Sequence, residues 1–146
     1  MLAYRAKFAP EKKAINVTFP DFPEAITCGY SEEEAMEYAV DALETILSEY
    51  IKRRREIPKP GKAKGKGMRL VALPALAEAK VRLYEAMRSR GVRKADLARR
   101  LGWHKSQMDR LLDLPHASRL DRIETALKGL HLRLAVSVEN CAAPSP

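Results

Sequence analysis

The sequence lacks the residues and runs on which several protein classes depend. Its 146 residues include two cysteines, and neither Cys28 nor Cys141 belongs to a CxxC or Cys/His pattern with metal-ligand spacing. We therefore expect no metal, no disulfide and no cofactor. No apolar run approaches the roughly 18 residues that cross a bilayer, and the N-terminus has no basic start followed by an apolar segment. These absences predict a cytoplasmic protein with no membrane partner.

Acidic and basic residues are unevenly distributed along the chain, and the net charge of +8 hides this division. Residues 1–51 carry 4 Lys/Arg against 10 Asp/Glu, residues 52–69 carry 9 against 1, and residues 70–146 carry 14 against 8. A basic C-terminal part can neutralise phosphates and release counterions, whereas a nucleic acid would repel the acidic part. We expect the acidic part to contact a basic partner instead.

Apolar and polar residues alternate in three short N-terminal runs, which is the pattern of half-buried β-strands. The runs cover residues 2–8, 15–19 and 25–29. A helix is predicted next, because Ser31 stands three residues before Glu34 at capping-box spacing and apolar residues then recur at steps of three and four. Residues 1–56 are therefore predicted to be a small antiparallel sheet with one helix packed on it, an α+β arrangement.

The middle of the chain has almost no apolar residues. From Lys52 to Gly67 it is rich in Lys, Arg, Pro and Gly, so it has little with which to bury a core. Residues 57–68 are therefore predicted to be a flexible basic linker. A solvated linker is favoured over a specific nucleic-acid contact, although its charge would add non-specific affinity for a polyanion.

Residues 69–139 are predicted to be a second domain, mostly α-helical, that binds DNA and dimerises. A strand over 69–73 precedes several helices, of which the last begins at Ser118 and ends at Gly129. Residues 130–138 alternate as a final strand, which we expect to pair with the 69–73 strand of the same chain or of a second copy. We favour a dimer, and we expect residues 140–146 to be a disordered tail.

Two short helices with a sharp turn between them are predicted from Val92 to Leu112. Ala98 is small where the second helix would cross, and Gly102 would supply the positive φ of the turn. Apolar residues at the remaining contact positions complete the pattern of a DNA-binding helix-turn-helix: Leu97, Leu101, Trp103, Met108 and Leu111. The alternative is an ordinary helical hairpin with a polar surface.

Polar residues are left to face outward on the second of these helices. We expect Gln107 and Lys105 to read base edges, and Ser106 and Arg110 to make phosphate or mixed contacts. The full set of DNA-binding candidates is His104, Lys105, Ser106, Gln107 and Arg110, with Arg99, Arg100 and Arg119 flanking the DNA backbone. His116 and His131 are expected to be structural.

Several segments together resemble the HicB antitoxins. They are the Phe19–Pro23 turn, the Ala25–Gly29 strand, the Ser31–Ala35 helix start, Asp96–Gly102 and Leu114–Ser118. The resemblance implies a type II toxin–antitoxin module in which HicB blocks HicA, a small basic ribonuclease that cleaves mRNA. It also implies an N-terminal domain similar to a pared-down ribonuclease H fold, and a helix-turn-helix that represses the operon as a dimer or higher oligomer.

The residues that would contact the toxin are inferred from charge alone. They are Asp21, Glu24, Glu33 and Glu37, although a solvated helix face is the ordinary explanation for most such carboxylates. A second hypothesis is a one-component regulator whose N-terminal domain senses a small molecule. A magnesium nuclease using Asp21, Glu24, Asp41 or Glu44 is disfavoured, because such cleavage needs several converging carboxylates. We predict that the protein is not an enzyme.

Overall fold

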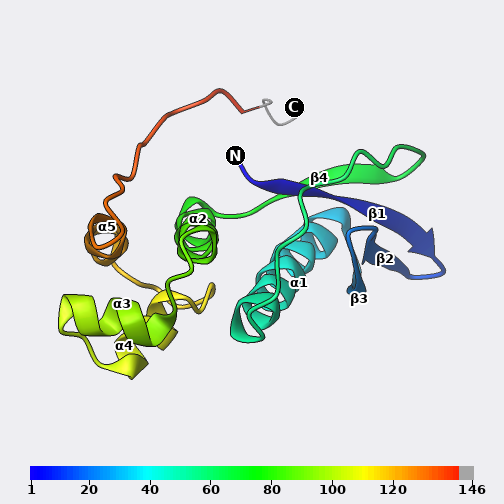
Figure 1. Ribbon diagram of the computed structural model, residues 1–146. Coiled ribbons are helices and arrows are strands. Elements are labelled where there is room, and N and C mark those ends of the chain that lie inside the picture. The colour runs from blue at the N-terminus through cyan, green and yellow to red at the C-terminus, as the bar shows by residue number, and fades with distance from the viewer. Residues whose placement is uncertain (142–146) are drawn as a thin grey trace.

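A four-stranded antiparallel sheet forms one side of the molecule in the computed structural model, which describes residues 1–141 (Figure 1). Its strands are β1 (Ala3–Glu11), β2 (Ala14–Phe19), β3 (Phe22–Gly29) and β4 (Met68–Ala72), in the order β3-β2-β1-β4. Tyr4, Ala6 and Phe8 are buried while Lys7 is exposed, as the alternation predicted. The predicted α+β fold is confirmed.

Helix α1 (Glu32–Lys52) covers one face of the sheet (Figure 1). It begins as predicted, because Ser31 Oγ accepts a hydrogen bond from the Glu34 N–H at 3.1 Å. The Glu34 carboxylate in turn accepts one from the Tyr30 N–H at 3.2 Å. Ala35, Ala39, Leu43 and Leu47 form the buried stripe of the helix, and these small and branched side chains let α1 lie close to the strands.

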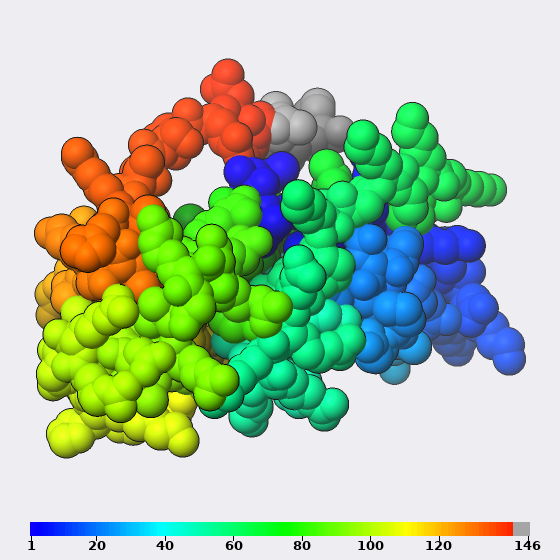
Figure 2. Space-filling view, in the orientation of Figure 1, coloured from blue at the N-terminus to red at the C-terminus, as the bar shows by residue number. Residues whose placement is uncertain are grey.

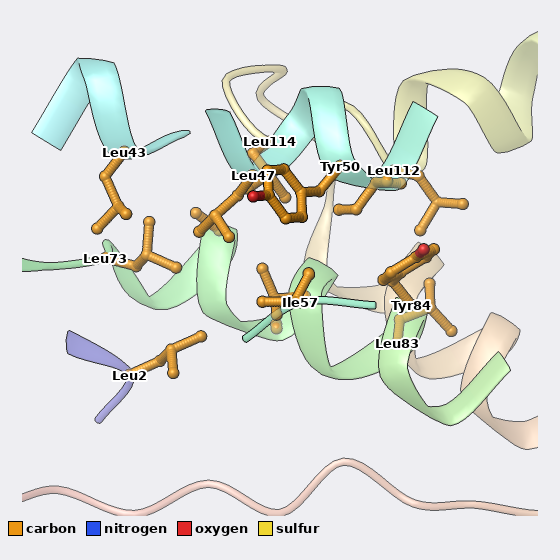
Figure 3. Packing of buried hydrophobic residues seen from close by; sticks show 14 of the residues in the cluster. Leu2, Leu43, Leu47, Tyr50, Ile57, Leu73, Leu83, Tyr84, Leu112 and Leu114 are labelled. Carbon is orange, nitrogen blue, oxygen red and sulfur yellow. The ribbon is translucent and has the colours of Figure 1, made fainter. Parts of the chain in front are cut away.

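The other four helices lie on the far side of α1 from the sheet (Figure 1). They are α2 (Ala75–Ser89), α3 (Lys94–Leu101), α4 (Lys105–Leu111) and α5 (Leu120–Lys128). Figure 3 shows Leu47 and Tyr50 of α1 near Leu112 and Leu114, which follow α4, with Leu83 of α2 in the same cluster. These residues and the sheet residues belong to one buried cluster. The two halves of the chain therefore share a single hydrophobic core.

The segment predicted to be a flexible linker is instead held against the folded chain. We call residues 53–67 the strap. Tyr4 Oη donates a hydrogen bond to the Pro58 carbonyl of the strap at 2.8 Å, and the Arg5 guanidinium donates one to the Ala63 carbonyl at 3.3 Å. The Gly61 N–H donates to the Asp21 carboxylate at 3.0 Å, and Ile57 is buried in the core. The expectation of flexibility was wrong because backbone groups and one apolar residue provide the attachment that side-chain composition did not indicate.

Within the chain, the 69–73 strand does not pair with residues 130–138, the partner predicted for it. β4 pairs with β1, with Ala3 opposite Ala72 and Lys7 opposite Met68. Residues 68–72 therefore belong to the N-terminal sheet and not to the helical part. β2 pairs with one side of β1, and β4 satisfies the backbone N–H and C=O groups on the other side.

The predicted final strand over residues 130–138 is not formed within the described part of the chain. These residues belong to the C-terminal arm, residues 130–141, which runs from α5 past α2 toward the N-terminus (Figure 1). Leu132 and Leu134 are half-buried, whereas Val136 and Val138 are 78% and 98% exposed. Of the predicted tail over residues 140–146, residues 142–146 lie outside the described residues.

Candidate functional site

Helices α3 and α4 form a close pair joined by a three-residue turn, which we call the α3–α4 pair. Gly102 ends α3 in the left-handed conformation at φ +67°, as its position predicted. The Trp103 N–H returns to Ala98 O at 2.9 Å, and Ala98 is buried where the helices meet. Leu97, Met108 and Leu111 are buried between them, while Leu101 and Trp103 are partly buried. The predicted contact set therefore holds the two helices together.

Both helices of the pair are capped by a side chain that reaches back to the residue before the helix. Asp96 accepts a hydrogen bond from the Arg93 N–H at 3.1 Å, and Gln107 Oε1 accepts one from the His104 N–H at 2.8 Å. Gln107 is consequently half-buried and does not face freely outward as expected. Its amide oxygen is engaged in the cap, which leaves its amide nitrogen as a donor for a base edge.

The other DNA-binding candidates separate into three groups. His104, Lys105, Ser106 and Arg110 are exposed at the start and along the outer side of α4. Arg99 and Arg119 extend into solvent and form ion pairs with Asp96 and Asp121. Arg100 turns toward α5 and donates to Gly129 O at 3.4 Å. The structure thus gathers the α4 residues on one surface and leaves Arg100 outside it.

One cation beside α4 was missed by the sequence analysis. The Arg122 guanidinium of α5 lies 5.2 Å from the centre of the Trp103 ring, a cation–π contact. Together with Gln107, Arg110 and Arg119 it lines a cavity of about 220 Å³. No local pattern in the sequence announces this contact, since it depends on how α5 packs beside the turn.

A buried lysine fixes the end of α4, and sequence reasoning missed its role. Lys80 of α2 has no exposed surface, and its Nζ donates to Asp113 O and His116 O at 2.7 Å and to Arg110 O at 3.2 Å. A cation at a helix C-terminus also complements the helix dipole. The available signal was a lysine inside the otherwise apolar stripe of α2.

Helix α1 holds the same loop from its other side. The Leu114 N–H donates to Ser48 Oγ of α1 at 3.1 Å. Residues 110–116 are therefore bonded both to α2, through Lys80, and to α1, through Ser48. The α3–α4 pair is positioned by side chains from the N-terminal helix as well as from its own half of the chain.

The acidic candidates do not all share one role. Glu24, Glu33 and Glu37 are exposed on β3 and the first turns of α1, but Asp21 is half-buried and accepts the Gly61 bond. Exposed apolar and aromatic side chains, which the sequence analysis did not single out, lie on the same two elements and the turn between them. They are Ile26, Tyr30 and Tyr38, at 68%, 77% and 44% exposure.

Nothing in the described part of the chain gathers carboxylates into a metal site. Among residues 1–141 no group of three or more His, Cys, Asp or Glu side chains could hold a metal ion.

Burial, and secondarily the charge of Asp41, raises the pKa of Glu44, with Lys80 acting in the opposite direction. His116 lies 3.1 Å from Ser118 Oγ, and His131 follows α5 at φ +60°. Within the same residues no helix is long and apolar enough to cross a membrane.

Comparison with known proteins assigns the family. A family described as HicB-like antitoxin of bacterial toxin–antitoxin systems matches residues 3–82, which include the whole sheet, α1 and part of α2. The chain belongs to the HicB antitoxin family. It is 39% identical over 139 residues to Antitoxin HicB of Pseudomonas fluorescens (strain Pf0-1), with 95% of each chain covered. This similarity extends through the α3–α4 pair and α5.

Two further HicB relatives match most of their own length. Antitoxin HicB 2 of Photorhabdus laumondii subsp. laumondii is 40% identical over 135 residues, which are 91% of this chain and 95% of the relative. Antitoxin HicB of Escherichia coli (strain K12) is 35% identical over 120 residues, or 82% and 86%. The chain is therefore an antitoxin of a toxin–antitoxin system, with a toxin as its partner. HicB antitoxins are non-enzymatic regulators, in agreement with the prediction that the chain is not an enzyme.

Lys80 provides a test of how the end of α4 is held. Lys80→Met removes the charged donor that joins the carbonyl groups of Arg110, Asp113 and His116, so we expect it to lower the free energy of unfolding by about 1–3 kcal/mol. Burial lowers the pKa of Lys80 from 10.5 to about 8, against the opposing charges of Asp113 and Glu44. Between these two pKa values the unfolded chain binds more protons than the folded chain, so stability due to Lys80 rises with pH.

The stability difference between the wild type and Lys80→Met should therefore widen from pH 8 toward pH 10.5. Urea unfolding of both proteins at several pH values measures it. Other titrating groups, including Tyr4, are present in both proteins and cancel in the difference. A difference that narrows with pH would contradict the direction of the shift.

Proposed function

We propose that this HicB-family protein neutralises a HicA-like toxin through its acidic N-terminal surface and represses its own operon through the α3–α4 pair, acting as a dimer. The observation that carries the proposal is that one folded chain has an acidic N-terminal part and a candidate surface on α4 with exposed cations. Residues 1–51 carry 4 Lys/Arg against 10 Asp/Glu, while the candidate surface of α4 presents exposed Lys105 and Arg110.

The surface proposed for the toxin lies on β3 and the start of α1. It combines exposed acids, Glu24, Glu33 and Glu37, with the exposed Ile26, Tyr30 and Tyr38. Tyrosines and apolar side chains at the centre of a contact supply affinity, and surrounding charges steer the partner. β3 is also an edge strand whose outer backbone groups are unpaired within the sheet. A small basic toxin matches this combination.

Charge reversal tests the toxin surface. Glu33→Lys with Glu37→Lys should weaken binding of the co-expressed toxin by roughly tenfold or more, chiefly through slower association at low salt. Surface plasmon resonance at two ionic strengths measures both rates. Operator binding should be unchanged.

A matched variant controls for net charge alone. Glu85→Lys with Glu124→Lys reverses two exposed acids on α2 and α5 and changes the total charge by the same amount. This variant should bind toxin like the wild type. Equal losses in the two double variants would remove the toxin surface from the proposal.

DNA binding is supported by the geometry and charge of the α3–α4 pair. Two short helices meet at a left-handed glycine, and α4 presents to solvent Lys105 and Ser106 at its start and Arg110 in its last turn. Side chains of this kind, at the start of a helix that can enter a major groove, bond base edges and phosphates. Arg99 and Arg119 stand beside them for backbone contacts.

Substitutions of Gln107 can separate its role in the cap of α4 from its proposed contact with DNA. Gln107→Glu keeps an oxygen that can accept the His104 N–H, but it removes the amide donor and places a negative charge against DNA. Thermal stability should stay near that of the wild type, while affinity for the promoter of its own operon should fall about tenfold or more. Gln107→Ala should lose affinity and also about 1 kcal/mol of stability, because the cap is gone.

Fluorescence anisotropy with the promoter duplex and differential scanning calorimetry provide the two readouts. Toxin binding serves as the control for both variants and should not change. A Gln107→Glu protein that binds the promoter as tightly as the wild type would show that Gln107 is only a cap.

The C-terminal arm supports a dimer. Its apolar residues alternate with polar ones, and Val136 and Val138 are both exposed in the single chain. An extended segment with exposed apolar side chains and unpaired backbone groups is suited to pairing with the same segment of a second copy. A dimer would also place two α3–α4 pairs on successive half-sites of an operator.

Substitutions on opposite sides of the arm test the dimer. Val136→Asp with Val138→Asp places two charges on the apolar side and should convert the dimer to a monomer in sedimentation equilibrium. Ala135→Asp with Ser137→Asp places the same two charges at the intervening positions and should leave the dimer intact. If both variants sediment like the wild type, the arm is not the dimer contact.

A further inference from the structure

A cationic pocket lies where the ends of α1 and α2 meet the start of α3. Its volume is about 350 Å³, and its apolar lining includes Ile51 and Val92. Among its lining residues no side chain is acidic and four are cationic: Arg54, Arg88, Arg93 and Lys94. Figure 2 shows the teal surface at the end of α1 beside the yellow-green surface of α3, where these elements adjoin.

Most of the positive charge of this pocket is not neutralised by the protein. Lys94 is paired with Asp109 at 3.0 Å. For Arg54, Arg88 and Arg93, no carboxylate oxygen lies within 4.0 Å in the part of the chain that the structure describes. Guanidinium groups gathered around one pocket repel each other, and a bound anion would offset this repulsion. The planar N–H donors of arginine match the geometry of phosphate oxygens. The chemistry of the pocket therefore favours a phosphate group.

Arg54 comes from the N-terminal half of the chain and is held in place by its backbone. Its φ of +56° is in the left-handed region, its N–H donates to Ile51 O at 3.1 Å, and its carbonyl accepts from Arg88 at 2.6 Å. Glycine or asparagine is the usual residue in such a position after a helix. The turn therefore does not require an arginine, and its side chain is available for a ligand.

The pocket is continuous with the surface of α4. Lys94 also lines a second cavity, of about 530 Å³, whose other charged residues are the cations Lys52, Lys105 and Arg110 and the acids Glu49, Asp109 and Asp113. A duplex lying on α4 carries closely spaced phosphates along both strands. Its backbone would therefore run beside the pocket on the side where α1 ends.

We infer that the cationic pocket binds a backbone phosphate of the operator next to the groove that α4 enters, and that Arg54 supplies part of this contact. The inference rests on the DNA-binding function proposed above. It extends that function by assigning a phosphate contact to a residue outside the α3–α4 pair, at the junction of α1 and the strap. Affinity for the operator would then depend on the N-terminal half being folded against α2.

Salt dependence measures this contact directly. Arg54→Asn removes the cation with a residue that tolerates the left-handed conformation, so the fold is retained. With full-length protein and a duplex carrying the promoter of its own operon, the slope of log affinity against log KCl concentration should become shallower by about 0.9. Affinity should fall several-fold, and by the same factor on a duplex of scrambled sequence.

Lys59→Gln is the matched control, because Lys59 is an exposed cation of the strap that does not line the pocket. Its slope should equal that of the wild type. An unchanged slope for Arg54→Asn, or an equal decrease in both variants, would overturn the inference. A wild-type protein that fails to bind the promoter duplex at all would overturn the proposed DNA-binding function itself.

A separate measurement distinguishes DNA from a small anion as the source of the phosphate. The thermal stability of the wild type and of Arg54→Asn is followed while inorganic phosphate is added without DNA. Stabilisation of the wild type alone, combined with equal salt slopes on DNA, would identify a small-anion site and overturn the assignment to the operator. A shallower slope for Arg54→Asn with no selective effect of inorganic phosphate supports it.

Discussion

Helix α1 packs against both the sheet and the helical half of the chain, and the rest of the structure depends on this. Ala35 lies against Gly29 and Tyr50 against Phe22 of the sheet, while Leu47 lies near Leu114 of the loop after α4. Burying a large apolar side chain is worth about 1.5–3 kcal/mol, so leaving either side in water would be costly for a chain of this size. The N-terminal sheet and the α3–α4 pair are therefore parts of one folded unit.

This shared core changes how the proposed binding surfaces relate to each other. The bonds from Ser48 and Lys80 fix the loop that follows α4, and Ser48 belongs to the same helix that carries Glu33 and Glu37. Both proposed partners therefore contact elements that are joined directly through α1. For an antitoxin of the HicB family, this geometry connects the proposed toxin surface to the proposed DNA surface through packed side chains and not through a flexible tether.

Local sequence patterns predicted those features that local interactions determine. The alternation in β1, the cap at Ser31 and the left-handed Gly102 each involve residues close together in the chain, and each was confirmed. The features that were missed depend on distant partners. The Tyr4 hydroxyl meets Pro58 and the Asp21 carboxylate meets Gly61, contacts that the composition of a Lys/Gly/Pro-rich segment does not indicate.

The candidate site shows the same division. The exposed side chains of α4 followed from helical spacing, and the predicted apolar contacts with α3 were found. The engagement of Gln107 in a cap, the Arg122 contact with Trp103 and the three bonds of Lys80 required the packed structure. Each involves a polar group whose choice of partner depends on packing geometry, whereas hydrophobic periodicity reports only which side of an element is buried.

The pairing of β1 with β4 affects how the chain folds during its synthesis. Ala3, at the start of the protein, pairs with Ala72, and the whole of α1 and the strap lies between them. Contacts between residues so far apart form late, because a long loop must close first. Until β4 leaves the ribosome, one side of β1 has unpaired N–H and C=O groups on which another nascent strand can add. Chains that stop before residue 72 keep that open edge permanently, which makes them prone to aggregation.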